Sequence, residues 1–188
     1  MNQITVTNAR PLLALHQLRG SGAQSGVDLS AIYCTPQSNG VLWFGTEGHY
    51  AGIVLDRAGL ALSAAGVQLP PGLNPDESLT IVDNLFLQGA NCLEGQIIPH
   101  PEFMWRKLVP QFGNVMLSPA TLAHTHVLKA VEFFKGLGSA PDSFLTIFTE
   151  GQGKPAVIVA SDLPDAFFLV MPARTENVAP SNWSEVLG

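Results

Sequence analysis

The residues with the most obvious chemical potential in this sequence are five histidines and two cysteines. The histidines stand at His16, His49, His100, His124 and His126. His124 and His126 are two residues apart, so on a helix their side chains diverge by about 200° and do not share a metal ion. Cys34 and Cys92 are far apart and lack CxxC spacing, which favours reduced packing residues over a zinc site or a disulfide. The pattern predicts no metal and no cofactor.

Catalytic motifs are equally weak. The run 151–154, Gly-Gln-Gly-Lys, resembles a fragment of a phosphate-binding loop. It lacks the GxxxxGK[ST] spacing and a following helix, so we interpret it as a hairpin turn. No GxSxG motif occurs, and no serine or cysteine has a context typical of a nucleophile. We therefore expect a protein that is not an enzyme.

The basic residues follow a pattern on two expected helices, at 9–19 and 120–135. These helices hold Arg10, Arg19, Lys129 and Lys135, which are four of the nine basic residues, but only Glu132 of the fifteen acidic ones. The two helices therefore carry a net charge of about +3 and the rest of the chain about −9. Two interpretations remain open, an ordinary solvated helix face and a surface for non-specific contact with phosphates.

The whole composition limits what such a surface can do. With 188 residues, 46% of them hydrophobic and 13% charged, the chain is sufficient for one compact domain, or two very small ones, with a full core. The net charge of −6 excludes wrapping of nucleic acid by the entire surface, so any DNA contact must come from a local patch. No apolar run approaches the roughly 20 residues that span a bilayer, and the first residues do not resemble a secretory signal. We expect a soluble, cytoplasmic protein.

The elements that position these residues recur in the same order twice. The first third predicts a strand at 4–7, the helix at 9–19, and strands at 29–35, 41–45 and 49–55. The last third predicts an extended segment at 114–117, the helix at 120–135, and strands at 143–149, 155–161 and 166–171. This repetition favours an α+β fold built from two strand-helix-three-strand halves, with antiparallel sheets and both helices on one side.

The middle of the chain is less regular. It predicts a strand at 60–69 and a hairpin of 79–87 with 91–98, joined near residues 88–90. We predict a single domain over residues 1–174, made of a first half at 1–56, an enlarged middle at 57–113 and a second half at 114–174. A polar tail follows at 175–188.

Two segments resemble sequences of a known family. Residues 41–51, Val-Leu-Trp-Phe-Gly-Thr-Glu-Gly-His-Tyr-Ala, resemble a strand pair that ends in Thr-Asp-Gly-His-Arg-Leu in bacterial β sliding clamps, the beta subunit of DNA polymerase III. Residues 168–174, Phe-Leu-Val-Met-Pro-Ala-Arg, resemble the closing Val-Val-Met-Pro-Met-Arg of the same family. A weaker match extends from 93–99 through 106–110 and resembles the segment that links two clamp domains. Glu47, Tyr50 and Ala173 depart from the family pattern.

The resemblance implies a fold and an assembly. A clamp domain has two strand-helix-three-strand halves related by a pseudo-twofold axis, with the helices toward DNA and the sheets outside. A bacterial clamp subunit has three such domains, whereas this chain has helices for about one. A ring around duplex DNA would then need about six subunits, joined head to tail at their sheet edges.

The resemblance also implies two sites. The peptide-binding cleft, which in the family receives short peptides from polymerases and clamp loaders, would comprise Thr46, Gly48, His49, Tyr50, Val170, Met171, Pro172 and Arg174. The DNA-binding side would comprise Arg10, Arg19, His124, Lys129 and Lys135. In the simpler interpretation, Val170 and Met171 end a core strand and Gly48 only permits a turn.

Three functions therefore remain open. The first is a homo-oligomeric processivity factor for DNA replication that encircles double-stranded DNA without sequence specificity and binds partner peptides. The second is a clamp-fold interaction module that does not encircle DNA. The third is an unrelated α+β domain whose motifs match by chance. None of them needs a membrane.

Overall fold

In the computed structural model of the protein, residues 3–24, 27–101, 122, 124–149 and 154–171 are described. The first half contains β1 (Gln3–Val6), α1 (Arg10–Gln17), β2 (Ala23–Gln24), β3 (Val27–Asp28), β4 (Ile32–Gln37), β5 (Gly40–Thr46) and β6 (Tyr50–Asp56). The middle contains β7 (Leu60–Ala61), β8 (Ala65–Gln68), β9 (Leu79–Val82), β10 (Leu85–Gln88), β11 (Asn91–Glu94) and β12 (Gln96–Ile98). The second half contains α2 (His124–Leu137), β13 (Leu145–Thr149), β14 (Ala156–Ala160) and β15 (Ala166–Val170).

The two halves meet in one antiparallel sheet. Its eight strands have the order β12-β8-β4-β5-β6-β15-β14-β13, so β6 pairs with β15 at the junction of the halves. The order β4-β5-β6 on one side is mirrored by β13-β14-β15 on the other, as a pseudo-twofold axis between β6 and β15 requires. A second sheet has the order β11-β10-β9-β1-β7. The expected α+β fold with two similar halves is confirmed.

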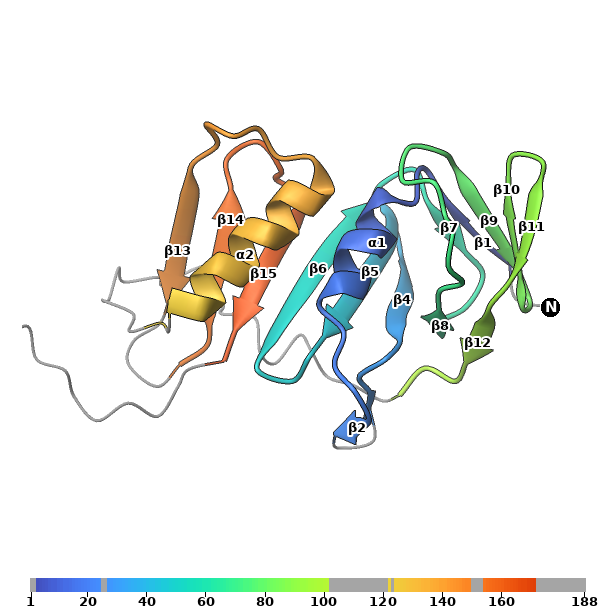
Figure 1. Cartoon of the computed structure of the whole chain (residues 1–188), viewed down its shortest axis with the longest axis horizontal. Coiled ribbons are helices and arrows are strands. Elements are labelled where there is room, and N and C mark those ends of the chain that lie inside the picture. The colour runs from blue at the N-terminus through green and yellow to red at the C-terminus, as the bar shows by residue number, and fades with distance from the viewer. Residues whose placement is uncertain (1–2, 25–26, 102–121, 123, 150–153, 172–188) are drawn as a thin grey trace, which may run out of the picture.

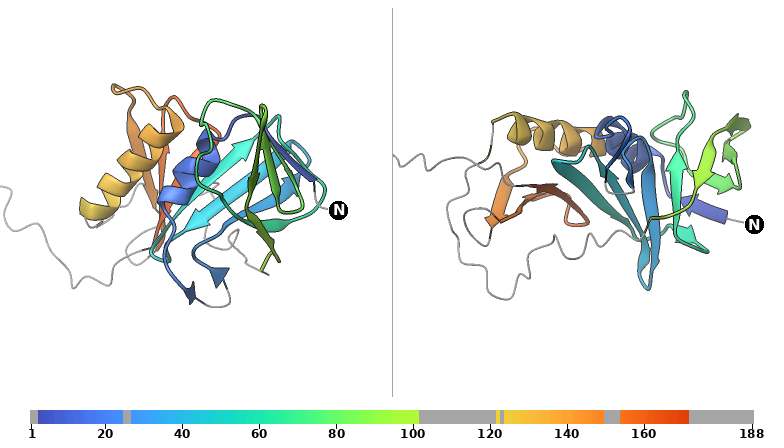
Figure 2. Two further views of the ribbon diagram at one scale, coloured as in Figure 1. Left: turned by 45° about the vertical axis from the view of Figure 1, so that its right-hand side comes forward. Right: turned by 90° about the horizontal axis from the view of Figure 1, so that it is seen from below.

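Both helices cover the same face of the eight-stranded sheet (Figures 1 and 2). They approach the strands closely because Gly45 of β5 lies directly opposite Gly52 of β6. A Cβ atom on Gly52 would lie only 2.6 Å from Cε2 of Phe133, and one on Gly45 would lie 3.0 Å from the carbonyl oxygen of Leu15. The absence of side chains at this pair therefore lets α1 and α2 pack against the central strands.

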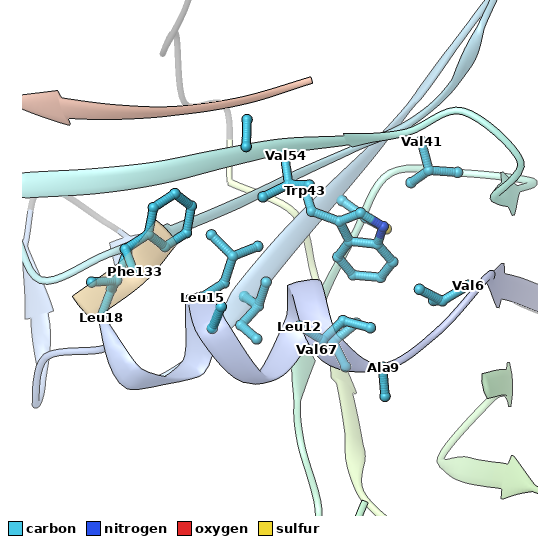
Figure 3. Packing of buried hydrophobic residues seen from close by; sticks show 14 of the residues in the cluster. Val6, Ala9, Leu12, Leu15, Leu18, Val41, Trp43, Val54, Val67 and Phe133 are labelled. Carbon is cyan, nitrogen blue, oxygen red and sulfur yellow. The ribbon is translucent and has the colours of Figure 1, made fainter. Parts of the chain in front are cut away.

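The core lies between the helices and the strands (Figure 3). Trp43 of β5 is fully buried there and lies near Leu12 and Leu15 of α1. A second buried cluster, which includes Phe44 and Ile53, lies on the other face of the sheet. The central strands are therefore apolar on both faces, which is why 41–45 is a continuous apolar run in the sequence rather than an alternating one.

Four predicted strands are wrong in detail. The strand expected at 91–98 is split, since β11 pairs with β10 in one sheet and β12 with β8 in the other. The strand expected at 79–87 is the hairpin of β9 and β10, because Asp83 adopts a φ of 51° and reverses the chain. The strand expected at 60–69 is split, since β7 pairs with β1 in one sheet and β8 with β4 in the other. The strand expected at 29–35 begins only at Ile32, because the side chain of Asp28 accepts hydrogen bonds from the main chain and hydroxyl of Ser30 and forms a local turn.

Other expectations agree closely or fall outside the described residues. The predicted hairpin joint near 88–90 is confirmed by the pairing of Gln88 with Asn91. Helix α2 ends at Leu137, two residues beyond the expected end. The segment 114–117, residues 120 and 121 of the expected helix, and the tail 175–188 lie outside the described part of the chain.

Candidate functional site

The turn between β5 and β6 carries the first motif of the predicted cleft. The Thr46 hydroxyl donates to the Tyr50 carbonyl oxygen at 2.9 Å and accepts a hydrogen bond from the Gly48 main chain at 2.9 Å. Gly48 has a φ of 110°, a conformation that side chains other than glycine rarely tolerate. Threonine and glycine in this motif therefore shape the turn and hold His49 at its tip.

The second motif lies directly beside the first. Tyr50 is the register partner of Val170, and the main chain of Met171 donates to the His49 carbonyl oxygen at 2.8 Å. Two segments that are about 120 residues apart in sequence thus meet in one ladder. The structure brings together six of the eight residues predicted for the cleft, and the other two, Pro172 and Arg174, lie outside the described residues.

The six residues differ in how far they are exposed to solvent. Thr46 and Val170 are buried, so in this conformation their side chains stabilise the turn and the core. His49 is exposed, and Gly48, Tyr50 and Met171 are half-buried. The surface that a peptide can reach is therefore formed by His49, Tyr50 and Met171.

The ring of Tyr50 is held by aromatic neighbours. It stacks on Phe168 with ring centres 5.4 Å apart and meets the edge of His126 from α2 at 6.1 Å. Burial, followed by the charge of Glu47, raises the pKa of Tyr50 to about 12. The phenol therefore stays neutral near neutral pH. Sequence reasoning did not place His126 in this site, because its half-burial and its contact with Tyr50 depend on how α2 packs on the sheet.

The predicted DNA-binding residues lie on or beside the two helices. The helices pack side by side, since a Cβ atom on Gly136 of α2 would lie 3.2 Å from Cβ of Ala14 in α1. Arg10, however, forms an ion pair with Asp76, and Lys129 forms one with Glu132 at 2.7 Å. Both pairs are exposed and screened by water, so either cation can exchange its carboxylate for another anion.

The remaining predicted residues are more available. Arg19, His124 and Lys135 are exposed, and none of them forms an ion pair with another residue in the described ranges. Burial, then the charge of Arg19, lowers the pKa of His16, which keeps this neighbouring histidine neutral. Arg19 and Lys135 are therefore the strongest candidates for phosphate contact on this side.

Comparison with known proteins rests on structure alone. No family model matches the sequence, and no curated protein matches it. Among solved structures, a DNA polymerase sliding clamp from Pseudomonas aeruginosa with ligand superposes with a TM-score of 0.64 at 10% identity, over 92% of this chain and 66% of that one. The fold is that of a bacterial sliding clamp.

Two further structures of this fold lead to the same assignment. A putative DNA polymerase III beta subunit from Eubacterium rectale superposes with a TM-score of 0.60 at 9% identity, over 94% of this chain and 66% of that one. The DNA polymerase III beta subunit from Thermotoga maritima superposes with a TM-score of 0.60 at 10% identity, over 100% of this chain and 68% of that one. The chain thus spans about two thirds of the length of these sliding clamps.

No group of three or more histidine, cysteine or acidic side chains in the described ranges is arranged to hold a metal ion. Neither described helix is long and apolar enough to cross a membrane.

Proposed function

We propose that this protein is a sliding-clamp-like accessory factor of DNA replication, whose copies assemble around double-stranded DNA and bind peptides of a polymerase or clamp loader. The proposal takes residues 1–174 as one clamp-like domain. It is supported by the sliding-clamp fold and by the position of both helices on one side of the sheet (Figure 2). In this arrangement the chain tethers an enzyme to DNA and performs no catalysis itself.

The observation that carries the assembly is the distribution of exposed apolar side chains. Among the described residues, seven large hydrophobic side chains are exposed, and they fall into two groups. The first group is Leu60, Leu62, Leu85 and Leu87, and the second is Leu128, Phe144 and Ile147. The elements that carry them lie at opposite ends of the molecule (Figure 1). Exposed apolar clusters of this kind are typical of protein interfaces.

The first group, the leucine patch, lies on the outer face of the five-stranded sheet. Leu85 and Leu87 alternate with buried Phe86 and Gln88 along β10, so their side chains point away from the core. Leu60 is opposite Thr5, and the Leu62 main chain donates to the Gln3 carbonyl oxygen at 3.3 Å, which extends the same face. Thr5 and Thr80 between its two ends are uncharged, whereas Glu94 opposite Leu85 places a carboxylate at its edge.

The second group, the β13 patch, lies at the β13 end of the eight-stranded sheet. β13 is the last strand of the eight-stranded sheet and pairs only with β14 among the described strands. Exposed apolar side chains gathered at the end of a sheet suit a contact with another chain. Because the two patches differ, they support head-to-tail contacts between copies, and such contacts close into a ring of about six if each copy supplies one domain.

A closed ring would direct the helix side toward DNA. Arg19 and Lys135, with His124, Lys129 and Arg10, would contact phosphates, and a few long basic side chains suit a weak contact that ignores sequence. His49, Tyr50 and Met171, with Thr46, Gly48, Val170, Pro172 and Arg174, would form the cleft for a partner peptide. Methionine and aromatic rings provide an adaptable apolar surface for this purpose.

The DNA contact is tested by charge reversal. Binding of a fluorescent 30-base-pair duplex would be measured across a salt series for the natural protein and for Arg19→Glu combined with Lys135→Glu. Each phosphate contact contributes about 0.9 to the slope of log K against log salt, so the double variant should flatten this slope by roughly 1.8. Lys154→Glu, which reverses an exposed charge outside the helices, is the control.

Equal slopes for the double variant and the natural protein would contradict a role for these residues at DNA. If the protein also forms no oligomers, the alternative of an interaction module that does not encircle DNA would be favoured. Peptide binding at the cleft would persist in that case.

A further inference from the structure

A hollow lies where the beginning of α1 and the end of α2 meet the turn between β14 and β15. Its volume is about 200 Å³. It is lined by Asn8, Arg10, Pro11, Val54, Leu137, Leu163, Pro164, Asp165 and Ala166. Val54 and Ala166 are almost fully buried and form its floor, whereas the side chains of Arg10 and Asp165 remain 37% and 34% exposed. The hollow is thus apolar inside and polar at its mouth.

The acceptor groups at the mouth already have partners. Both carboxylate oxygens of Asp165 accept from Arg57, whose Nε donates at 2.7 Å, and this pairing lowers the pKa of Asp165. The Asp165 carbonyl oxygen accepts from the Leu55 main chain at 2.8 Å. The side-chain oxygen of Asn8 accepts from the main chain of Arg10 at 3.2 Å. A ligand therefore finds few open acceptors here.

Donor groups at the mouth are more available. Arg10 donates to Asp76 through Nη2, and its other guanidinium N–H groups have no partner among the described residues. The side-chain NH2 group of Asn8 likewise has no hydrogen-bond partner among the described residues. Asp76 is 68% exposed, so water screens its attraction for Arg10. An arginine fork beside an amide donor is suited to bind a carboxylate.

We propose that this hollow binds the C-terminal residue of a partner protein, with an apolar side chain on the floor and the terminal carboxylate on Arg10 and Asn8. An apolar cavity of about 150 Å³ is sufficient for benzene, so the hollow accepts one side chain of leucine or phenylalanine size. A residue inside a chain would fill the floor but would bring no carboxylate to Arg10. The chemistry of the mouth therefore selects a chain end.

The hollow is separate from the proposed peptide cleft. Ala166 begins β15 and Val170 ends it, so the two sites lie at opposite ends of the same strand. The hollow also joins both halves of the fold, since α1 belongs to the first half and Leu137 and Leu163 to the second. The proposal depends neither on ring formation nor on the cleft, and a bound chain end would stabilise the contact between the halves.

The test uses the full chain and a peptide probe, acetyl-Gly-Gly-Leu with a free C-terminal carboxylate. NMR signals from the methyl groups of Val54, Leu137 and Leu163 would be followed during titration. We expect saturable shifts at these methyl groups, with binding at least about tenfold weaker for the same peptide ending in an amide, since a charge-assisted bond is lost. Acetyl-Gly-Gly-Asp should not bind, because its side chain is charged.

Equal affinity of the carboxylate and amide forms, or the absence of shifts at these methyl groups, would overturn the proposal without any variant. Among variants, Arg10→Gln should weaken binding of the carboxylate form about tenfold and leave the weak binding of the amide form unchanged. Lys154→Gln removes one positive charge at the far end of β14 and should bind like the natural protein. Equal binding by Arg10→Gln would also refute the assignment.

Discussion

At the scale of single residues, Asp162 shows how one exposed carboxylate holds several segments together. It accepts hydrogen bonds from the hydroxyl of Ser139 at 2.8 Å, from the main chain of Ala140 at 2.7 Å, and from the hydroxyl of Ser143. These residues connect the end of α2 to the start of β13, and Asp162 itself begins the turn before β15. The carboxylate thus fixes α2 relative to the sheet.

We predict that this contact makes stability depend on pH below 4. The hydrogen bonds, led by that of Ser143, lower the pKa of Asp162 from 3.8 to about 2. A group with a lowered pKa stabilises the folded state above its unfolded pKa, and this contribution disappears as pH falls from about 4 to 2. Thermal melts of the natural protein and Asp162→Asn should therefore differ most at neutral pH and converge near pH 2. A constant difference across this range would contradict the role.

Met171 provides the residue-scale test of the cleft. Its main chain bonds to His49 through backbone atoms, so Met171→Glu keeps that bond and places a charge on the apolar surface. Binding of a peptide from the cognate polymerase, measured by calorimetry, should weaken at least about tenfold because the charge resists desolvation. Gln96→Glu adds the same charge at an exposed position of β12, away from the cleft and from both patches, as a control. Unchanged binding by Met171→Glu would eliminate the cleft from the proposal.

The sequence contains the two motifs, but only the structure shows that their strands pair. The resemblance assigned eight residues of these motifs to one cleft, and the pairing of Tyr50 with Val170 places the described members side by side. The eight are Thr46, Gly48, His49, Tyr50, Val170, Met171, Pro172 and Arg174. The burial of Val170 agrees with the simpler interpretation, in which it ends a core strand, whereas Met171 is half-buried. The hollow beside Arg10 also depends on contacts between distant segments, which periodicity does not encode.

At the scale of elements, α2 is held by aromatic packing on the central strands. Phe133 is 1% exposed, and its ring lies 5.2 Å from that of Phe134 and 5.7 Å from that of Phe168. Gly52 leaves the space that this ring fills. The attachment of α2 to the sheet therefore depends on one buried ring more than on helix propensity, as is usual for amphipathic helices.

Phe133→Ala should lower the free energy of unfolding by about 3–5 kcal/mol, because a large buried ring is lost and a cavity remains. The matched control is Phe144→Ala, since Phe144 is 78% exposed and its removal leaves no cavity. Chemical denaturation monitored by circular dichroism would measure both variants. Similar losses for the two would contradict the assignment of Phe133 to the core.

Hydrophobic periodicity in the sequence predicted most helices and strands, but it did not predict which strands share a sheet. The two helices and the strands of both halves were predictable because each carries an uninterrupted apolar pattern. The middle was predicted less well, since Asp83 and Asn84 form a two-residue turn inside the apolar run 79–87. The division of 60–69 between two sheets depends on pairing with β1 and β4, and such long-range partners are not visible in a local pattern.

At the scale of the whole molecule, the leucine patch and the β13 patch determine whether copies associate. If they contact one another between copies, a charge in one patch should break the assembly. We therefore expect Leu62→Glu, at a side chain that is 65% exposed, to reduce the mass in solution without unfolding the chain. Gln17→Glu adds the same charge on α1, away from both patches, and should leave the mass unchanged.

The most direct test of the central claim is the absolute mass of the natural protein in solution, measured by light scattering over a concentration series. A ring of about six copies of the 20.0 kDa chain would give roughly 120 kDa, and this mass should fall for Leu62→Glu. Another closed assembly large enough for duplex DNA would also agree with the proposal. A mass that stays at 20.0 kDa at every concentration would contradict encirclement of DNA and favour an interaction module with the same fold.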